Sequence, residues 1–174
     1  ADRVAGMQES VLSHPVLGRF VKAPGRCELS VFATDPETGV FVKCRFDKLL
    51  DAKLAIDVKK TQDLRDFGKS VANYGYHMQA AFYTDVWKWA TGEDLDGFMF
   101  AAVEEQMPHA SAMITLDDEA MDIGRMEYRK ALNTYAECFE RDEWNGIYQE
   151  LAPVQLPSWY INQFENESEV KFDE

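Results

Sequence analysis

The hydrophobic and polar positions along the chain follow two different periods, and each change of period marks the boundary of an expected element. The segments whose apolar residues recur at helical spacing are residues 3–13, 64–73, 74–92 and 117–141. The segments that alternate or are apolar over a short run, as strands are, are residues 28–35, 40–47, 53–60, 98–106 and 110–116. This order predicts an α/β domain with a central mixed β-sheet flanked by helices.

The turns and the last helix add detail to this prediction. Residues 36–39, Pro-Glu-Thr-Gly, have the composition of a turn and would join the first two strands in a β-hairpin. In the last helix, the apolar residues Met121, Ile123, Met126 and Leu132 are expected to form one buried face.

The length and the apolar content of the chain favour a single folded unit. With 174 residues, 46% of them apolar, the chain can bury a core, and we expect one domain over residues 1–174. Residues 165–174 are predicted to be an acidic tail. Because the sequence opens on Ala1 rather than Met, it leaves open a fragment that lacks an N-terminal helix.

The charge balance argues against one class of DNA-binding protein. The chain has 18 basic and 31 acidic residues, a formal net charge of −13, whereas a simple coat for nucleic acid is usually basic. The balance does not exclude an enzyme that gathers carboxylates around a metal and keeps its basic residues on one face.

The cysteines and the hydropathy exclude two further classes. Cys27, Cys44 and Cys138 are far apart and include no C-x-x-C pair, so neither a zinc knuckle nor an iron–sulfur cluster is predicted. No apolar run is long enough to span a membrane. We therefore expect reduced thiols, no membrane partner and a cytoplasmic location.

The stretch AIDVKK, residues 55–60, carries the first candidate chemistry. On a strand, Asp57 and Lys59 point to the same face, and Asp47 closes the preceding strand, so the two carboxylates can meet at one end of the sheet. Two carboxylates and a backbone carbonyl suit Mg²⁺, which prefers oxygen ligands and retains waters. A lysine beside the cation can orient a water or stabilise charge on a phosphate, which is the chemistry of phosphodiester hydrolysis.

The alternative interpretation of this stretch is solvated surface charge. An acid followed two residues later by a lysine is common by chance, and exposed strand faces often carry alternating charges. The spacing to Asp47 favours the catalytic interpretation without deciding the question.

The helix expected over residues 74–92 carries a second candidate pair. Gln79 and Tyr83 lie four apart and share one helical face, where a glutamine near the sheet needs a hydrogen-bonding partner. The alternative is a satisfied glutamine beside an ordinary core tyrosine. Four other aromatic residues of this helix could be base-stacking platforms, but aromatic residues on helices are more often core or interface residues: Tyr74, Tyr76, Trp87 and Trp89.

Together, Asp47, the DVK of residues 57–59 and the QxxxY of Gln79 and Tyr83 resemble the RecB-like branch of the PD-(D/E)XK nucleases, and the RecE-like (exonuclease VIII) nuclease domains in particular. The order and context of these motifs match over roughly residues 7 to 160. The supporting stretches are residues 27–47, 57–63, 73–83 and 156–159. The combination is specific, although no single motif is.

The resemblance implies a metal-dependent active site. It makes Asp47, Asp57 and the Val58 carbonyl ligands of Mg²⁺, for which Mn²⁺ could substitute, and it makes Lys59 the catalytic lysine. Glu28 matches an acidic residue at the start of the first core strand and would be an outer metal ligand or a supporting group.

The resemblance also assigns a role to the helix and reveals one departure. Gln79 and Tyr83 would help to position the active-site face and the DNA end. Relatives carry a histidine on an upstream helix, in a Gly-x-x-x-His setting, whereas His14 lies in Ser-His-Pro, and His77 and His109 lie in other segments. We therefore expect the family histidine to be cut away or lost from this chain.

The basic residues around these motifs are candidates for DNA contacts. Lys43, Arg45 and Lys60, with Thr61, could follow a phosphate backbone, and the alternative is solvated strand charge.

Three functions remain open at this point. The resemblance favours a Mg²⁺-dependent 5′→3′ exonuclease of bacterial or phage origin, which acts on double-stranded DNA ends. The 3′ single strand it leaves would pass to a RecT-like annealing protein, and the enzyme would form a homo-oligomeric ring. The alternatives are a catalytically silent, nuclease-like DNA-binding domain and a RecB-like endonuclease.

Overall fold

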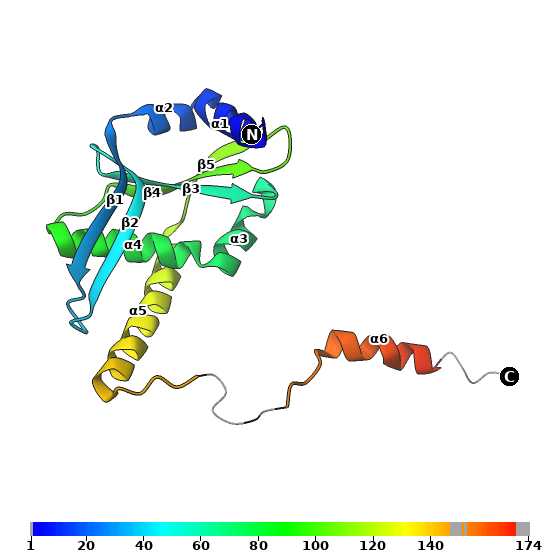
Figure 1. The fold of residues 1–174 in the computed structure, drawn as a ribbon. Helices are drawn as coiled ribbons and strands as arrows, with labels where there is room; N and C mark the ends of the chain where they lie inside the picture. Colours follow the sequence, from blue (N-terminus) through cyan, green and yellow to red (C-terminus); the bar gives the residue numbers. More distant parts are fainter. Residues whose placement is uncertain (1, 147–150, 152, 170–174) are drawn as a thin grey trace. The chain divides into compact units, whose positions relative to one another are not determined.

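The computed structural model describes residues 2–146, 151 and 153–169 (Figure 1). The helices are α1 (Asp2–Ser13), α2 (Leu17–Lys22), the short 3₁₀ helix η1 (Leu64–Asp66), α3 (Phe67–Tyr74), α4 (Tyr76–Thr91), α5 (Asp118–Arg141) and α6 (Ser158–Glu169). The strands are β1 (Gly25–Thr34), β2 (Phe41–Leu50), β3 (Leu54–Thr61), β4 (Gly97–Glu104) and β5 (Ser111–Thr115). Contacts divide the chain into two units, Ala1–Glu137, which holds the sheet, and Cys138–Glu174.

The five strands form one mixed sheet in the order β1-β2-β3-β4-β5. All neighbours pair antiparallel except β3 and β4, which pair in parallel and are connected through η1, α3 and α4. A parallel pair needs such a crossover, because the chain must return to the same end of the sheet. The predicted α/β fold with a mixed sheet flanked by helices is confirmed.

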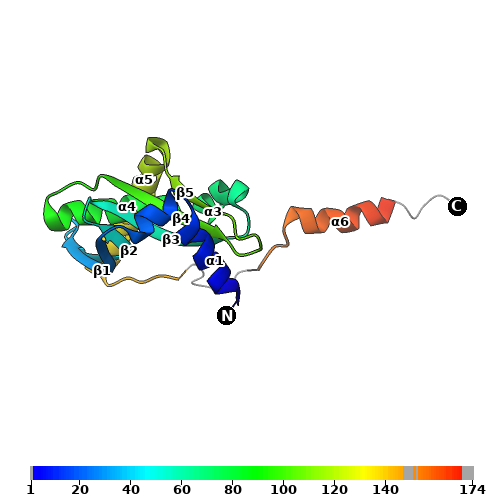
Figure 2. The same cartoon turned by 90° about the horizontal axis from the view of Figure 1, so that it is seen from above.

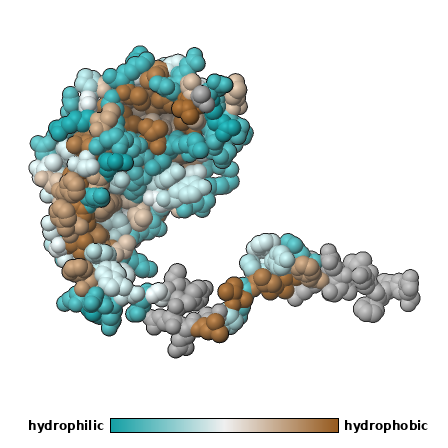
Figure 3. Space-filling view, in the orientation of Figure 1, coloured by the Kyte–Doolittle hydropathy of each residue, from teal (hydrophilic) through white to brown (hydrophobic). Residues whose placement is uncertain are grey.

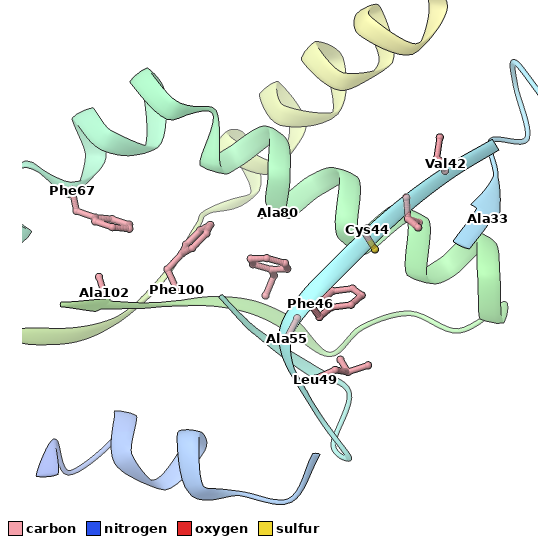
Figure 4. Packing of buried hydrophobic residues seen from close by; sticks show 12 residues of the cluster. Ala33, Val42, Cys44, Phe46, Leu49, Ala55, Phe67, Ala80, Phe100 and Ala102 are labelled. Atoms are coloured by element: carbon pink, nitrogen blue, oxygen red, sulfur yellow. The ribbon is translucent and has the colours of Figure 1, made fainter. Parts of the chain in front are cut away.

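Helices cover both faces of this sheet (Figures 1 and 2). The larger core lies on the α4 face, where Phe46 and Phe100 are among the most deeply buried side chains (Figure 4). A smaller core on the other face contains Leu17 of α2 and Ile56 of β3. Alternate residues of β3 therefore face different cores, which is why its sequence is apolar on both sides.

The surface of this unit is mainly polar. Figure 3 shows hydrophilic residues over most of the visible face, with apolar residues gathered in a few patches. One apolar pair is Phe32 and Phe41 on paired strands, whose stacked rings lie 5.9 Å apart while the side chains are 52% and 70% exposed. No helix in the described ranges is both long enough and apolar enough to cross a membrane.

The structure corrects the expected buried face of the last helix. Met121 and Leu132 pack against the core, but Ile123 and Met126 are 40% and 65% exposed. Ile123 and Met126, two and five positions after Met121, lie about 200° and 140° around the helix axis from it, away from the buried stripe. The buried positions between Met121 and Leu132 are Gly124 and Tyr128.

Two helices were absent from the sequence prediction. Helix α2 is only six residues long, too short to show a period, and α6 lies within the stretch that had no assigned element. The predicted acidic tail starts inside α6, and residues 170–174 lie outside the described part of the chain.

Candidate active site

The site begins where strands β2 and β3 separate. Their ladder contains two residue pairs, Lys48 with Ile56 and Leu49 with Ala55, and the same register continued by one step would bring Asp47 opposite Asp57. Beyond these pairs, the Val58 amide donates its hydrogen bond to the Asp47 carboxylate, at 2.8 Å, and not to a backbone carbonyl.

This separation turns one backbone carbonyl toward the carboxylates. In an extended strand, the N–H and C=O of one residue point to the same edge, because paired residues exchange both hydrogen bonds. The Val58 N–H points at Asp47, so the Val58 carbonyl is directed to the same gap between β2 and β3.

Asp57, Lys59 and Gln79 form a closed polar network on the α4 face of the sheet. The Lys59 ammonium lies 2.6 Å from Asp57 Oδ2, and it donates a hydrogen bond to Gln79 Oε1 at 2.8 Å. The Gln79 amide in turn donates to Asp57 Oδ1 at 2.6 Å. The predicted shared face of Asp57 and Lys59 is therefore present, and α4 supplies the hydrogen-bonding reason for a glutamine near the sheet.

Burial sets the electrostatics of this network. Only 5% of the Asp57 side chain and 17% of the Lys59 side chain are exposed. Burial raises the pKa of Asp57 above its usual range, and the nearby Asp47 carboxylate raises it further. Lys59 and the hydrogen bond from Gln79 oppose that rise, since both favour the charged form.

Two aromatic rings complete the surroundings of Lys59. Its ammonium lies 4.5 Å from the centre of the Tyr76 ring and 5.9 Å from that of Phe100. Burial raises the pKa of Tyr76, as do the nearby Tyr74 and Asp57. Tyr76 was expected to be an ordinary core or interface residue. Its position three residues before Gln79, on the same helical face, was the signal that could have identified it.

The donor atoms at this gap fit a divalent cation. Asp47 and Asp57 are close enough for their charges to interact, and the Val58 carbonyl is directed to the gap beside Asp47. Together they are an oxygen set that Mg²⁺ or Mn²⁺ would accept. In the described ranges, no three His, Cys, Asp or Glu side chains gather as a metal cluster. Mg²⁺ does not need such a cluster, because it is usually held by one or two carboxylates and keeps several waters.

The structure places Glu28 at the margin of the site. It lies opposite Asp47 in the β1–β2 register but outside the ladder, with φ of 52°, and its carboxylate pairs with Arg45 at 3.1 Å. Because 62% of the Glu28 side chain is exposed, its role as an outer metal ligand stays a prediction.

The proposed DNA contacts do not form one patch. Lys43 and Arg45 are exposed on the face of β2 opposite its buried residues Val42, Cys44 and Phe46.

Burial raises the pKa of the Cys44 thiol to about 12, so it is a packed, protonated thiol.

Lys60 and Thr61 lie at the far end of β3. Lys60 pairs with Glu105 at 3.2 Å, and Glu105 also accepts hydrogen bonds from Arg3 and Gln62. Thr61 is buried, and its hydroxyl donates to the Asp63 carbonyl, so its side chain is oriented inward.

Tyr83 lies one helical turn beyond Gln79, inside the aromatic core. Its ring meets Phe46 and Phe98 edge to face, at 5.4 and 6.2 Å. This environment is that of a core tyrosine, and its role at the DNA end stays a prediction.

The three histidines of the chain have partners away from the Asp57 network. His14 Nδ1 accepts the Leu17 amide, His77 contacts the Val71 carbonyl and lies 2.9 Å from Glu127, and His109 contacts the Glu104 carbonyl.

Comparison with known proteins identifies the family. Residues 2–150 match the family described as a PDDEXK-like domain of unknown function (DUF3799). The chain belongs to this family. The sequence-based resemblance to PD-(D/E)XK nucleases is thereby confirmed.

The solved structure of another protein shares the fold of this PDDEXK-like domain. A candidate exonuclease from Eubacterium rectale aligns with a TM-score of 0.70 at 14% identity, over 93% of this chain. The chain spans 64% of the length of that protein. A phage-related exonuclease from Haemophilus somnus 129PT aligns with a TM-score of 0.47 at 15% identity, over 80% of this chain and 72% of its own. No curated protein matches the PDDEXK-like chain significantly.

Proposed function

We propose that this PDDEXK-like domain is a metal-dependent exodeoxyribonuclease that degrades one strand of linear double-stranded DNA from its 5′ end. The observation that carries the proposal is the Asp57–Lys59–Gln79 network beside Asp47 and the Val58 carbonyl. A buried acid and a partly buried ammonium held together at the open end of a sheet are costly for folding alone, so a functional role is the simpler account.

Each residue has a distinct part in the proposed reaction. Asp47, Asp57 and the Val58 carbonyl would hold Mg²⁺, which would supply Lewis-acid stabilisation of phosphate charge when bound. Lys59 presents its ammonium to the phosphate or to the attacking water. Gln79 holds both Lys59 and Asp57 by hydrogen bonds, so that neither side chain has to reorganise during the reaction.

The decisive experiment is digestion of linear and circular duplex DNA with Mg²⁺, with Mn²⁺ and with EDTA, using 5′-labelled and 3′-labelled ends. We expect metal-dependent loss of the 5′ label from linear DNA and no effect on circles. Lys59→Met should abolish digestion, and Lys130→Met, on the exposed surface of α5, is the matched control. Full activity of Lys59→Met would overturn the site assignment, and cleavage of circular DNA would favour an endonuclease.

A second candidate is a nuclease-like domain that binds DNA ends without cutting them. The positions of the three histidines support it, because none of them has a partner in the Asp57 network. Binding of labelled duplex ends without metal-dependent products, also in a chain extended upstream, would select this candidate.

The resemblance to RecE-like domains further supports two proposals about assembly. The first is a homo-oligomeric ring around the DNA, which light scattering would test as a mass that is a multiple of 19.9 kDa. The second is transfer of the 3′ strand to a RecT-like annealing protein, which co-purification of the two proteins on resected DNA would test.

A further inference from the structure

A cavity of about 300 Å³ adjoins the active site on the side of η1 and α3. It is lined by residues 60–63, Asp66, Ser70, Tyr74 and Tyr76. Its volume is at the lower end of the range for small-molecule sites, which suits a group about as large as a nucleoside.

One wall of this cavity is a pair of stacked tyrosines. The rings of Tyr74 and Tyr76 lie 5.7 Å apart with an angle of 30° between their planes. Gly75 separates the two residues with a left-handed φ of 65°, a conformation that glycine adopts without strain. The turn between α3 and α4 therefore fixes both rings side by side, and Tyr74 remains 72% exposed.

The inner tyrosine connects this wall to the proposed catalytic lysine. The Tyr76 ring lies 4.5 Å from the Lys59 ammonium, on the same helix as Gln79. A group stacked against the exposed Tyr74 would thus be separated from Lys59 by the two stacked tyrosine rings.

The charges of the cavity favour a base and sugar over a phosphate inside it. Asp63 and Asp66 line the cavity, and the hydrogen bonds from Arg65 lower the pKa of Asp63 to about 2, so that it is ionised at neutral pH. Asp63 is paired with Arg65, Asp66 with Lys69, and Lys60 of the lining with Glu105, so the described lining offers a phosphate no uncompensated cation. The two carboxylates can still accept hydrogen bonds from the amino groups of a base. Lys59, beyond Tyr76, would attract the phosphate.

From this arrangement we propose that the cavity is a nucleoside subsite of the DNA strand being cut. It takes an unpaired base close to the scissile phosphate by stacking on Tyr74, while that phosphate lies at Lys59. This inference rests on the proposed nuclease function and adds to it that the enzyme separates at least one terminal base from its partner strand. Aromatic stacking suits such a site, because every base presents a π face and no sequence preference is needed.

The test is a double-mutant cycle that combines variants of the protein with variants of the DNA. Binding of the full chain to a labelled duplex is measured by fluorescence anisotropy, with Ca²⁺ as the cation that does not support cleavage. The duplex carries either a normal nucleotide or an abasic analogue at the first or the second position of the 5′ end. Tyr74→Ala is compared with Tyr74→Phe, which keeps the ring, and with Phe41→Ala, which removes an exposed aromatic residue from the β1–β2 hairpin.

We expect the wild type to bind the abasic duplex about 5- to 100-fold more weakly than the intact duplex, at one of the two positions. Tyr74→Ala should bind both duplexes equally weakly, while Tyr74→Phe and Phe41→Ala should retain the wild-type discrimination. Equal discrimination by Tyr74→Ala and the wild type would overturn the subsite.

Digestion with Mg²⁺ separates this inference from the proposed function. Tyr74-dependent discrimination without any digestion would overturn the exonuclease but retain the subsite. Digestion that is indifferent to Tyr74 and to the abasic position would retain the exonuclease and overturn the subsite.

Discussion

At the scale of single residues, the defining feature of the site is the proximity of Asp47 to the buried Asp57. Asp47 serves as an acceptor for the Val58 amide, and its charge also raises the pKa of Asp57. One side chain thus stabilises the local backbone and destabilises its neighbour, as expected where function rather than stability has set the arrangement.

The variant Asp47→Asn separates these two effects. The amide oxygen still accepts the Val58 hydrogen bond, but the repulsion of Asp57 is gone, so we expect stability to stay equal or to rise by an amount on the order of 1 kcal/mol. Metal-dependent digestion and the rise of Tm on addition of Mg²⁺ should both be lost. Thermal unfolding with and without Mg²⁺, beside the digestion assay, measures each effect.

The pH dependence of this variant has a defined sign. The pKa of Asp57 is raised on folding, so protonation of Asp57 favours the folded state. This contribution to the free energy of unfolding is complete below the ordinary pKa of 3.8 and is lost as the pH rises through the raised value. The advantage of Asp47→Asn should therefore be present at neutral pH and vanish in acid. Asp51→Asn, on an exposed turn, is the matched control, and an equal change in that variant would contradict the explanation.

The sequence predicted part of this site, for identifiable reasons. The common face of Asp57 and Lys59 follows from strand alternation, and the need of Gln79 for a hydrogen-bonding partner follows from its place on an apolar helix near the sheet. That its partners are Lys59 and Asp57 was not predicted. The bond from Val58 to Asp47 could not be predicted, because it depends on where the β2–β3 ladder ends. The inward orientation of Thr61 depends on the turn that follows β3, which alternation alone does not describe.

At the scale of elements, the close approach of α5 to α4 holds the helical layer together. A Cβ atom on Gly124 would lie 2.3 Å from the His77 carbonyl oxygen, closer than any real contact. A glycine is required at position 124 because the backbones of α4 and α5 lie too close together there to accept a Cβ atom, and not because its backbone angles are unusual.

Gly124→Ala should therefore be destabilising by about 1–3 kcal/mol, since α5 would have to move away from α4. Gly68→Ala, in α3, has nothing within 4 Å of the added methyl group and should instead stabilise by roughly 0.5–1 kcal/mol through helix propensity. Urea unfolding of both variants gives the comparison. Similar effects of the two changes would contradict the close packing inferred here.

A buried ion pair connects α5 to the β1–β2 turn. Arg129 lies 2.6 Å from the fully buried Asp35, whose carboxylate also accepts the Thr38 amide. Burial by itself would raise the pKa of Asp35, but Arg129 and Thr38 outweigh it and lower the pKa below its usual value.

Arg129→Met should cost about 3–5 kcal/mol at neutral pH, because it leaves a buried carboxylate without its cation. In the wild type, this stabilisation is complete above the ordinary pKa of 3.8 and is lost as the pH falls through the lowered value. The difference in unfolding free energy between the two proteins should therefore shrink in acid. A difference that is constant from pH 7 to pH 3 would contradict the role of the Asp35 charge.

The sequence predicted the elements better than the faces they bury. Strand alternation located the hairpin and the central strands, since each is long enough to show its period. The face of α5 was wrong at Ile123 and Met126, because an apolar residue is compatible with either side of a helix until its packing partners are known.

At the scale of the whole molecule, the proposed function requires a net charge of −13 to coexist with a polyanionic substrate. Several cations near the site already have carboxylate partners, as in the pairs Arg45 with Glu28 and Lys60 with Glu105. Few cations are then available for phosphates, and binding should depend on salt only moderately.

We expect log K for duplex DNA, measured in EDTA, to fall with log of the salt concentration with a slope of about −2 to −4. Lys43→Ala should reduce the magnitude of the slope by about 1, whereas Lys130→Ala should leave it unchanged. Anisotropy titrations from low to physiological salt measure this. If Lys43→Ala leaves the slope unaltered, the exposed face of β2 does not contact the DNA.

The position of Glu105 has a consequence for the dynamics of the chain. Its carboxylate receives Arg3 from α1, Lys60 from the end of β3 and Gln62 from the cavity lining. Helix α1 lies on the face of the sheet opposite α4, the helix that carries Gln79, yet the Glu105 carboxylate connects α1 to the wall of the cavity (Figure 1). Opening of that wall and detachment of α1 should therefore be coupled, although only weakly, because an exposed ion pair contributes little free energy. Hydrogen exchange of the backbone amides of residues 60–63, with and without the Arg3 side chain, measures this coupling.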